Sequence, residues 1–159
     1  MIGNLFSALN FSAALGAGLV AGIFFAFSTF VMQALARLPA AQGIAAMQSI
    51  NVVVLNPIFL TVFMGTAAIC TVLAVAAFFR WHEAGAAYLL AGSLLYLIGT
   101  FLVTVAFNVP LNDALAVVDP QSAEGATLWT QYLASWTGWN HVRSAAALAS
   151  LASFIVAFR

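Results

Sequence analysis

The sequence predicts an all-α integral membrane protein, a bundle of four transmembrane helices. The first observation is composition: hydrophobic residues make up 65% of the 159 residues and charged residues 5%, whereas roughly 25% of a soluble protein is charged. The second is that the few charges leave long uncharged runs, of which residues 38–79 are one. A helix needs about 20 mostly apolar residues to cross a bilayer, so these runs are long enough to form spans.

The same numbers exclude several other classes of protein. Four basic and four acidic side chains are too few to cover the surface of a soluble domain or to keep a chain disordered. A net charge of zero excludes a nucleic-acid-binding protein, because such proteins present a basic surface. The one cysteine, Cys70, excludes a disulfide framework.

In order, the predicted spans cover residues 11–33, 57–79, 86–107 and 139–158 of a single domain, 1–159. The first is predicted as a span rather than a cleaved signal peptide, because no positive charge precedes it and its apolar run is too long. The last apolar run is short, which indicates that its helix starts before Arg143.

A short extra helix is predicted ahead of the second span. Asn56-Pro57 marks a break, because Asn is a preferred N-cap and Pro suits the first position of a helix. The second span therefore starts at Pro57. Residues 40–55 form a short helix at the interface or a re-entrant piece, since the residue before a proline disfavours helix.

The third span is predicted to end near Pro110, whose missing N–H interrupts the helical hydrogen bonds. Residues 114–136 then form the one long loop outside the membrane. Asp119-Pro120 is a second pair of N-cap and first helical residue, so this loop between spans three and four is predicted to be partly helical.

Polar residues concentrate at one membrane face, the one where the first span ends, here named face B. Face A, opposite it, carries only interfacial anchors at Arg80, His82, Glu83 and Arg159. Polar residues gather at helix ends in general, but that tendency does not explain why the amides favour one face. The pattern predicts a functional pocket that opens at face B. Its polar residues are Gln33, Arg37, Gln48, Asn51, Asn56, Asn108, Asn112, Asp113, Asn140, His141 and Arg143.

Three of these residues, His141, Arg143 and Asp113, are candidates for catalysis. Histidine is the side-chain type whose ordinary pKa lies closest to neutrality, so His141 is either a general base, oriented by Asp113, or an interfacial histidine bonded to a backbone carbonyl. With Asn140 at the bundle centre, the helical period of 100° per residue places His141 and Arg143 on its two sides. Arg143 then binds an anionic oxygen of a ligand, pairs with Asp113 or extends to the lipid headgroups, and the first two together are favoured over the third.

The remaining candidates are amides and indoles that bind a substrate. Asn108 and Asn112 either contact a ligand or lock the break at Pro110 by hydrogen bonds. Asn56 is interpreted first as the N-cap of the second span. No such local structural role explains the amide of Asn51, so ligand binding is the more open interpretation there. Trp136 and Trp139 form either an aromatic belt or the walls of a pocket for a flat ligand. The substrate-binding set is Asn51, Asn56, Asn108, Asn112, Trp136, Trp139 and Asn140.

Small residues recur at a regular interval at Gly85, Gly92 and Gly99. Such stripes let helices pack closely, either within one chain or between copies in a homo-oligomer. His82 and His141 fall on opposite faces, so no metal site is expected. The expected partners are a lipophilic small molecule and the lipid bilayer.

Three strings together resemble the anthrone oxygenase–like family of small four-helix membrane proteins. The resemblance covers nearly the whole chain, and the second and third strings are fairly specific in combination. The strings are Asn51-Val-Val-Val-Leu-Asn-Pro-Ile-Phe59, Phe107-Asn-Val-Pro-Leu-Asn-Asp-Ala-Leu115 and Trp136-Thr-Gly-Trp-Asn-His-Val-Arg143.

The resemblance implies a pocket in which a planar phenolic substrate is oxidised by dioxygen with no evident cofactor, as anthrones are oxidised to anthraquinones. It implies His141 as the base and Arg143 or an asparagine as the partner of the developing oxyanion, through the chemistry of acid–base and electrostatic catalysis. The positions that match the family are Asn56, Asn108, Asn112, Trp139, Asn140, His141 and Arg143.

Two functions follow from these patterns. One is a cofactor-independent oxygenase that acts on a planar phenolic or anthrone-like substrate. The alternative is a non-enzymatic membrane protein that binds a quinone, a lipid or a partner helix at the same polar face. The expected location is the bacterial inner membrane. If Arg37 and Arg143 are buried in the site, the remaining arginines make face A cytoplasmic and place both termini inside.

Overall fold

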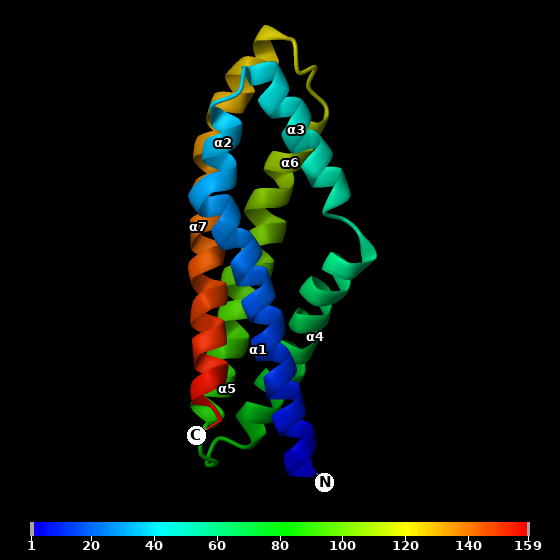
Figure 1. The fold of residues 1–159 in the computed structure, drawn as a ribbon. Coiled ribbons are helices and arrows are strands. Elements are labelled where there is room, and N and C mark those ends of the chain that lie inside the picture. The colour runs from blue at the N-terminus through cyan, green and yellow to red at the C-terminus, as the bar shows by residue number, and fades with distance from the viewer. Residues whose placement is uncertain (1, 159) are drawn as a thin grey trace.

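A computed structural model of the protein describes residues 2–158 and shows helices joined by short connections (Figure 1). The predicted all-α class is therefore confirmed. Arg159, predicted as an anchor at face A, lies outside the described residues. The helices are α1 (Ile2–Ala26), η1 (Phe27–Val31), α2 (Met32–Ala36), α3 (Ala40–Val53), α4 (Pro57–Phe79), α5 (Ala86–Leu94), η2 (Leu95–Leu102), η3 (Thr104–Asn108), α6 (Val109–Ala116) and α7 (Ala123–Val156), of which η1, η2 and η3 are π-helices.

Three continuous helical stretches among the described residues are long and apolar enough to cross a membrane. They are Leu5–Ala36, Pro57–Phe79 and Ala86–Ala116, and they contain the first three predicted spans. The chain therefore has the helices of a membrane protein. The helix α7 has 34 residues, but Asn140, His141 and Arg143 lower the hydropathy of its middle, so the fourth span stays a prediction.

Helix α7 holds the bundle together. It packs against α1 along much of its length and against α5 and η2 on another side. Figure 1 shows α1 rising from the N-terminal end and α7 returning to the same end, where the C-terminus also lies. The core at this end contains Val20, Leu73, Tyr96 and Phe154, all buried.

Three hydrogen bonds join helices across this core. Asn10 Nδ2 donates to the Phe154 carbonyl at 3.1 Å, and Ser150 Oγ donates to the Gly92 carbonyl at 2.7 Å. Tyr96 Oη donates to the Phe63 carbonyl at 3.1 Å. Between helices in a bilayer, such bonds and close packing stabilise association, because burial of apolar surface from lipid contributes little.

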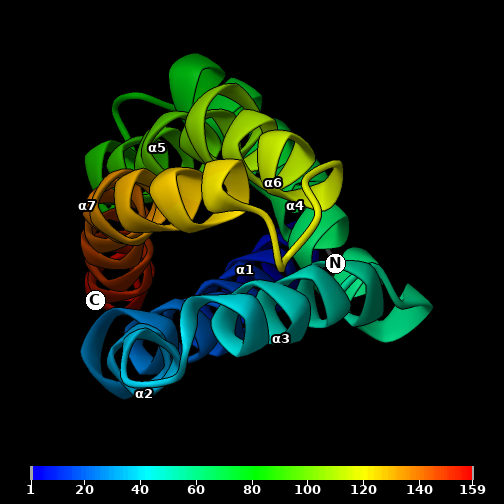
Figure 2. The same ribbon diagram turned by 90° about the horizontal axis from the view of Figure 1, so that it is seen from above.

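The opposite end of the bundle is built differently. There α2 and α3 lie on one side and α6 and α7 on the other, as the view from above shows (Figure 2). Ile44 and Met47 on α3 pack with Leu115 and Trp129 in a second core. The amide of Gln48 ties α3 to the end of α6, because its Nε2 donates to the carbonyls of Leu115 at 2.8 Å and Val118 at 3.1 Å.

The break predicted in the helix near Pro110 is absent. The helix continues through Pro110 to Ala116, and the π-helix η3 ends two residues before the proline. A π-helical turn is wider than an α-helical turn, and proline otherwise clashes with the carbonyl one turn earlier and lacks an N–H. The wide turn therefore accommodates the proline without ending the helix.

The helix starts are predicted correctly at one site and wrongly at another. Asn56 caps α4, as predicted, because its Oδ1 accepts a hydrogen bond from the Phe59 N–H at 3.0 Å. The start expected at Asp119-Pro120 is wrong: Ser122 caps α7 instead, through a bond of 2.9 Å from the Gly125 N–H. Asp119 Oδ1 accepts from the Gln121 N–H at 2.9 Å, which makes a tight turn that precedes the helix. The short helix predicted at residues 40–55 is present as α3.

A glycine substitution tests the close packing of α7. A Cβ atom at Gly99 would meet the Cβ of Ala146 at 2.5 Å, whereas one at Gly22 would meet nothing within 4 Å. The Cβ of Ala146 is attached directly to the backbone of α7 and cannot move aside without the helix. Gly99→Ala is therefore expected to cost about 1–3 kcal/mol of unfolding free energy. The measurement is the unfolding midpoint in detergent micelles.

Gly22→Ala is the matched control and is expected to keep or slightly raise the midpoint, because alanine favours helix over glycine. An equal loss of stability in both variants would contradict the packing described for α7.

Candidate functional site

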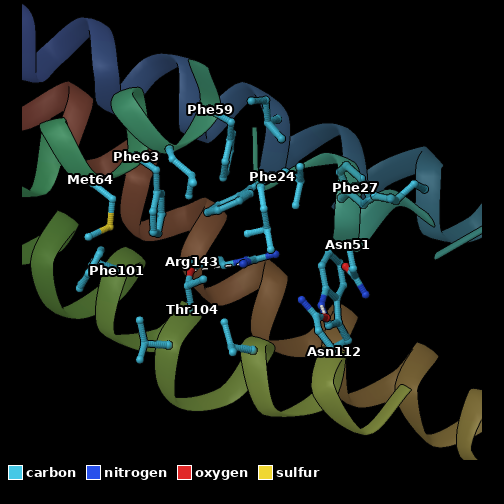
Figure 3. A pocket seen from close by; sticks show the side chains of 18 of the residues that line it. Phe24, Phe27, Asn51, Phe59, Phe63, Met64, Phe101, Thr104, Asn112 and Arg143 are labelled. Carbon is cyan, nitrogen blue, oxygen red and sulfur yellow. Dashed lines mark hydrogen bonds between the residues drawn. The ribbon is translucent and has the colours of Figure 1, made fainter. Parts of the chain in front are cut away.

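A cavity of about 310 Å³ lies between the α3–α4 connection, α1, the η2–η3–α6 stretch and α7 (Figure 3). Its size falls at the lower end of sites for small molecules, about 300–1,000 Å³. Every one of these segments contributes to the wall. The lining residues are Ile23, Phe24, Phe27, Met47, Ile50, Asn51, Val54, Leu55, Phe59, Leu60, Phe63, Met64, Phe101, Thr104, Val105, Val109, Asn112, Trp136 and Arg143.

Most of the wall is apolar, and one side is aromatic. The ring of Phe63 stacks on Phe101 with centroids 5.4 Å apart and on Phe59 with centroids 5.7 Å apart. Phe63 also meets the edge of the Phe24 ring. Such a wall favours a flat, lipophilic ligand, because aromatic rings contact one another best when offset-stacked or edge-to-face.

The mouth of the cavity is formed by side chains that both line it and are exposed on the outside of the bundle. Leu55 is 63% exposed, Met64 52% and Val105 49%, with Leu60 and Val109 beside them. All of these side chains are apolar. The cavity therefore opens between apolar side chains on the outside of the bundle.

The polar part of the wall centres on Arg143, whose side chain is 5% exposed. Its Nε donates to Asn140 Oδ1 at 2.8 Å, and its Nη1 donates to Thr104 Oγ1 at 3.2 Å. The guanidinium carbon lies 3.8 Å from the centroid of the Phe24 ring and 4.8 Å from that of Trp136, so two aromatic faces stabilise the charge.

No carboxylate neutralises this arginine. Within residues 2–158 the ion pair that the structure contains joins Arg80 to Glu83, at 2.6 Å. A guanidinium has five N–H donors, and the two side-chain bonds of Arg143 leave others free at the cavity. The wall therefore presents an unpaired cation in a surrounding of low polarity, where it attracts an anion strongly.

Asn140 holds Arg143 in place from behind. The side chain is fully buried, and its Nδ2 donates to the Phe24 carbonyl at 2.7 Å and to Ser28 Oγ at 2.6 Å. These bonds leave Oδ1 directed at Arg143. Asn140 thus links α1 to α7 and fixes the guanidinium, and it does not line the cavity itself.

A second polar group, Asn112, lies on the other side of Trp136 from Arg143. Asn112 Oδ1 accepts from Tyr132 Oη at 2.8 Å and from Trp136 Nε1 at 2.8 Å. Burial raises the pKa of the Tyr132 hydroxyl above its usual range, so the hydroxyl stays protonated and remains a donor to Asn112.

The structure brings four of the predicted site residues to the cavity: Asn51, Asn112, Trp136 and Arg143. The other four predicted substrate-binding residues do not line it. Asn56 is exposed and caps α4. Asn108 is fully buried and donates from Nδ2 to the Trp136 carbonyl at 3.2 Å, so its role is structural, but it joins η3 to α7 instead of locking a break at Pro110. Trp139 stacks on Phe107 with centroids 3.7 Å apart, and Asn140 is the buried link described above.

The geometry does not place His141 and Asp113 where the sequence analysis expected them. Both are exposed, and neither lines the cavity. The expectation that His141 and Arg143 both flank the site is therefore not met. The reason is the helical period: Asn140 and Arg143 are about 60° apart around α7, so when both face inward His141, about 160° from Arg143, faces outward.

Sequence reasoning missed Thr104, Phe24 and Ser28. Thr104 and Ser28 lie within apolar spans, where hydroxyls are common without function. A usable signal was present for Thr104, since Thr100 and Thr104 lie four residues apart on one helix face. Polar groups repeated at that spacing inside a span indicate an inward-facing polar surface.

Comparison with known families gives a match to the anthrone oxygenase family over residues 59–153, which is more than half of the chain. The chain belongs to the anthrone oxygenase family. The resemblance found in the sequence is confirmed. No curated protein and no solved structure matches the chain. The family match begins at Phe59, so Phe24 and Asn51 line the cavity from outside the matched stretch.

A pair of neighbouring substitutions tests the anchoring of Arg143. Asn140→Ala removes the acceptor of Arg143 Nε and the donor to α1, and it leaves buried polar groups unpaired. The unfolding free energy is expected to fall by about 2–3 kcal/mol, measured by denaturant titration in micelles.

His141→Ala, one residue away on the same helix, is the control. Because its side chain is exposed, the expected change is below about 0.5 kcal/mol. A larger loss from the histidine substitution than from the asparagine substitution would contradict the site as described.

Proposed function

We propose that the protein is a cofactor-independent oxygenase that oxidises a planar, anthrone-like substrate with dioxygen. The observation that carries this proposal is the unpaired guanidinium of Arg143 in the wall of an apolar, aromatic cavity. Membership of the anthrone oxygenase family supports it. An anthrone supplies what the site lacks, since it is flat and lipophilic and becomes an oxyanion when it loses a proton.

The reaction balances without a further reagent. The CH₂ group between the two rings loses a proton to water, which gives a delocalised enolate. The enolate passes an electron to dioxygen, and the resulting carbon radical and superoxide combine into a peroxide. The proton lost first returns to the terminal peroxide oxygen, which leaves as water when the remaining C–H proton departs. The sum is CH₂ + O₂ → C=O + H₂O.

The role of Arg143 in this scheme is to stabilise the enolate oxygen. A fixed donor in a dry site lowers the pKa of the bound substrate, and it does so without reorganisation during the reaction. Among the described residues that line the cavity there is no His, Asp, Glu or Lys. The contribution of the chain is therefore stabilisation of the anion, and not proton transfer to a side chain.

A second candidate is a protein that binds a quinone or lipid at this cavity and catalyses nothing. The observation that favours it is the same absence of a side-chain base among the described lining residues. Both candidates predict that the protein binds the ligand. They differ in whether oxygen is consumed.

Oxygen uptake by the purified protein separates these candidates. With an anthrone as substrate and spontaneous oxidation in empty micelles subtracted, Arg143→Gln is expected to lower kcat/KM by about 100-fold or more. Arg143→Lys keeps the charge but loses the fork of donors, so an intermediate rate is expected.

His141→Ala is the control here and should retain the wild-type rate within about twofold, because the side chain is exposed and does not line the cavity. A collapse of the rate in this variant would restore the histidine as the base. Absence of turnover in the wild-type protein would reject the enzyme and leave the binding protein.

We also propose that α7 forms the fourth span in the bacterial inner membrane. Its length and its position beside α1 support this, and both ends of the chain would then lie on one side, the cytoplasmic one. Thiol labelling of intact cells tests it: Ala157→Cys should be reached only from the cytoplasm and Ala123→Cys only from outside. The native Cys70 is buried and does not interfere. Labelling of both positions from the same side would reject the fourth span.

A further inference from the structure

The cavity has a second polar end, separate from Arg143. Asn51 on α3 and Asn112 on α6 face each other there (Figure 3). The Trp136 ring lies between the two ends: its centroid is 4.8 Å from the guanidinium carbon of Arg143, and its Nε1 donates to Asn112 Oδ1 at 2.8 Å. A ligand that reaches from Arg143 to the asparagines therefore extends across the width of an aromatic ring.

The network fixes which atom of Asn112 meets a ligand. Its Oδ1 accepts hydrogen bonds from both Tyr132 Oη and Trp136 Nε1, each at 2.8 Å. Two donors occupy the two lone pairs of an amide oxygen. The group that remains for a ligand is the amide nitrogen, so Asn112 is a hydrogen-bond donor to the cavity.

Asn51 is oriented in the opposite sense. Its amide nitrogen is buried and makes no hydrogen bond of good geometry, although the side chain lies beside the Tyr132 hydroxyl, whose oxygen is a group that this nitrogen could approach as a donor. Since that hydroxyl already donates to Asn112, an Asn51 oxygen in its place would put two oxygens together with no proton between them. The oxygen of Asn51 is therefore the polar atom left for the cavity, and Asn51 is an acceptor.

We propose that Asn51 and Asn112 form a subsite for a neutral phenolic hydroxyl of the ligand. The hydroxyl accepts from Asn112 Nδ2 and donates to Asn51 Oδ1, which is the pairing that a hydroxyl makes and that a carbonyl or an ether cannot complete. This inference rests on the proposed function, because Arg143 holds the reacting oxygen at the other end. On the ring edge away from the guanidinium, the two asparagines then select a substituent that both accepts and donates a hydrogen bond.

Binding of unreactive probes tests the subsite independently of turnover. The probes are anthraquinone, 2-methoxyanthraquinone, which can only accept, and 2-hydroxyanthraquinone, which accepts and donates. Binding is measured by quenching of tryptophan fluorescence in micelles, at a pH where the hydroxyl is neutral. The wild-type protein should bind the hydroxy probe about fivefold more tightly than the methoxy probe, the value of one neutral hydrogen bond.

Asn51→Ala removes the acceptor and should lower the affinity for the hydroxy probe to that for the methoxy probe, about fivefold, with the other two probes unaffected. Ser49→Ala, at an exposed position on the same helix, is the control and should keep the wild-type order. Arg143→Gln should weaken all three probes by a similar factor and keep the preference for the hydroxyl.

Equal affinity of the wild-type protein for the hydroxy and methoxy probes would overturn the subsite, as would a preference that survives in Asn51→Ala. Neither result depends on oxygen uptake. A preference for the hydroxy probe without oxygen consumption would support the subsite and reject the proposed activity. Oxygen consumption without the preference would support the activity and reject the subsite.

Discussion

A buried guanidinium without a carboxylate is the constraint around which this bundle is arranged. Removing a charge from water costs several kcal/mol, and an arginine inside a membrane helix is retained only where partners compensate it. Here the compensation comes from three directions: Asn140 on the same helix, Thr104 across the bundle and the ring of Phe24 on α1. Displacing any of these helices would leave the charge less well stabilised.

The placement of Arg143 also separates a polar region of the site from an apolar one. The guanidinium demands a polar shell, and that shell lies behind the wall, where Asn140 and Ser28 are buried. The cavity side remains apolar and opens between exposed aliphatic side chains. A lipophilic ligand and dioxygen, both of which dissolve well in hydrocarbon, can therefore meet the charge without crossing a layer of water.

Much of the fold follows from composition and from a few punctuating residues. The uncharged runs located the first three spans, and Asn56-Pro57 located the start of α4, because caps and prolines act locally. The prediction at Pro110 was wrong because a wide π-helical turn accommodates the proline. The proline alone does not indicate whether the helix ends there or widens before it. Ser122 rather than Asp119 caps α7 for a similar reason: both are good caps, and tertiary packing selects between them.

The candidate site was predicted in part. The clustering of amides pointed to Asn51, Asn112 and Arg143, yet one sequence cannot fix the rotation of a helix that is polar on two sides. The rotation of α7 is set by packing of Ala147, Ser150 and Phe154, which lie between about two and four turns from His141, against its neighbours. Phe24 and Ser28, which complete the site from α1, are residue types that are common in an apolar span. Their part in the site is recognisable only once the helices are assembled.

The π-helices η2 and η3 have one consequence for how such a site diverges. They lie in the helix that supplies Phe101, Thr104 and Asn112 to the wall, and a π-turn holds an extra residue relative to an α-helix. Loss or gain of one residue there would rotate Asn112 relative to Thr104 by about 100° without breaking the helix. Within a family of this architecture, the angular phase of a single helix can therefore change the spacing of oxygen atoms that the cavity accepts.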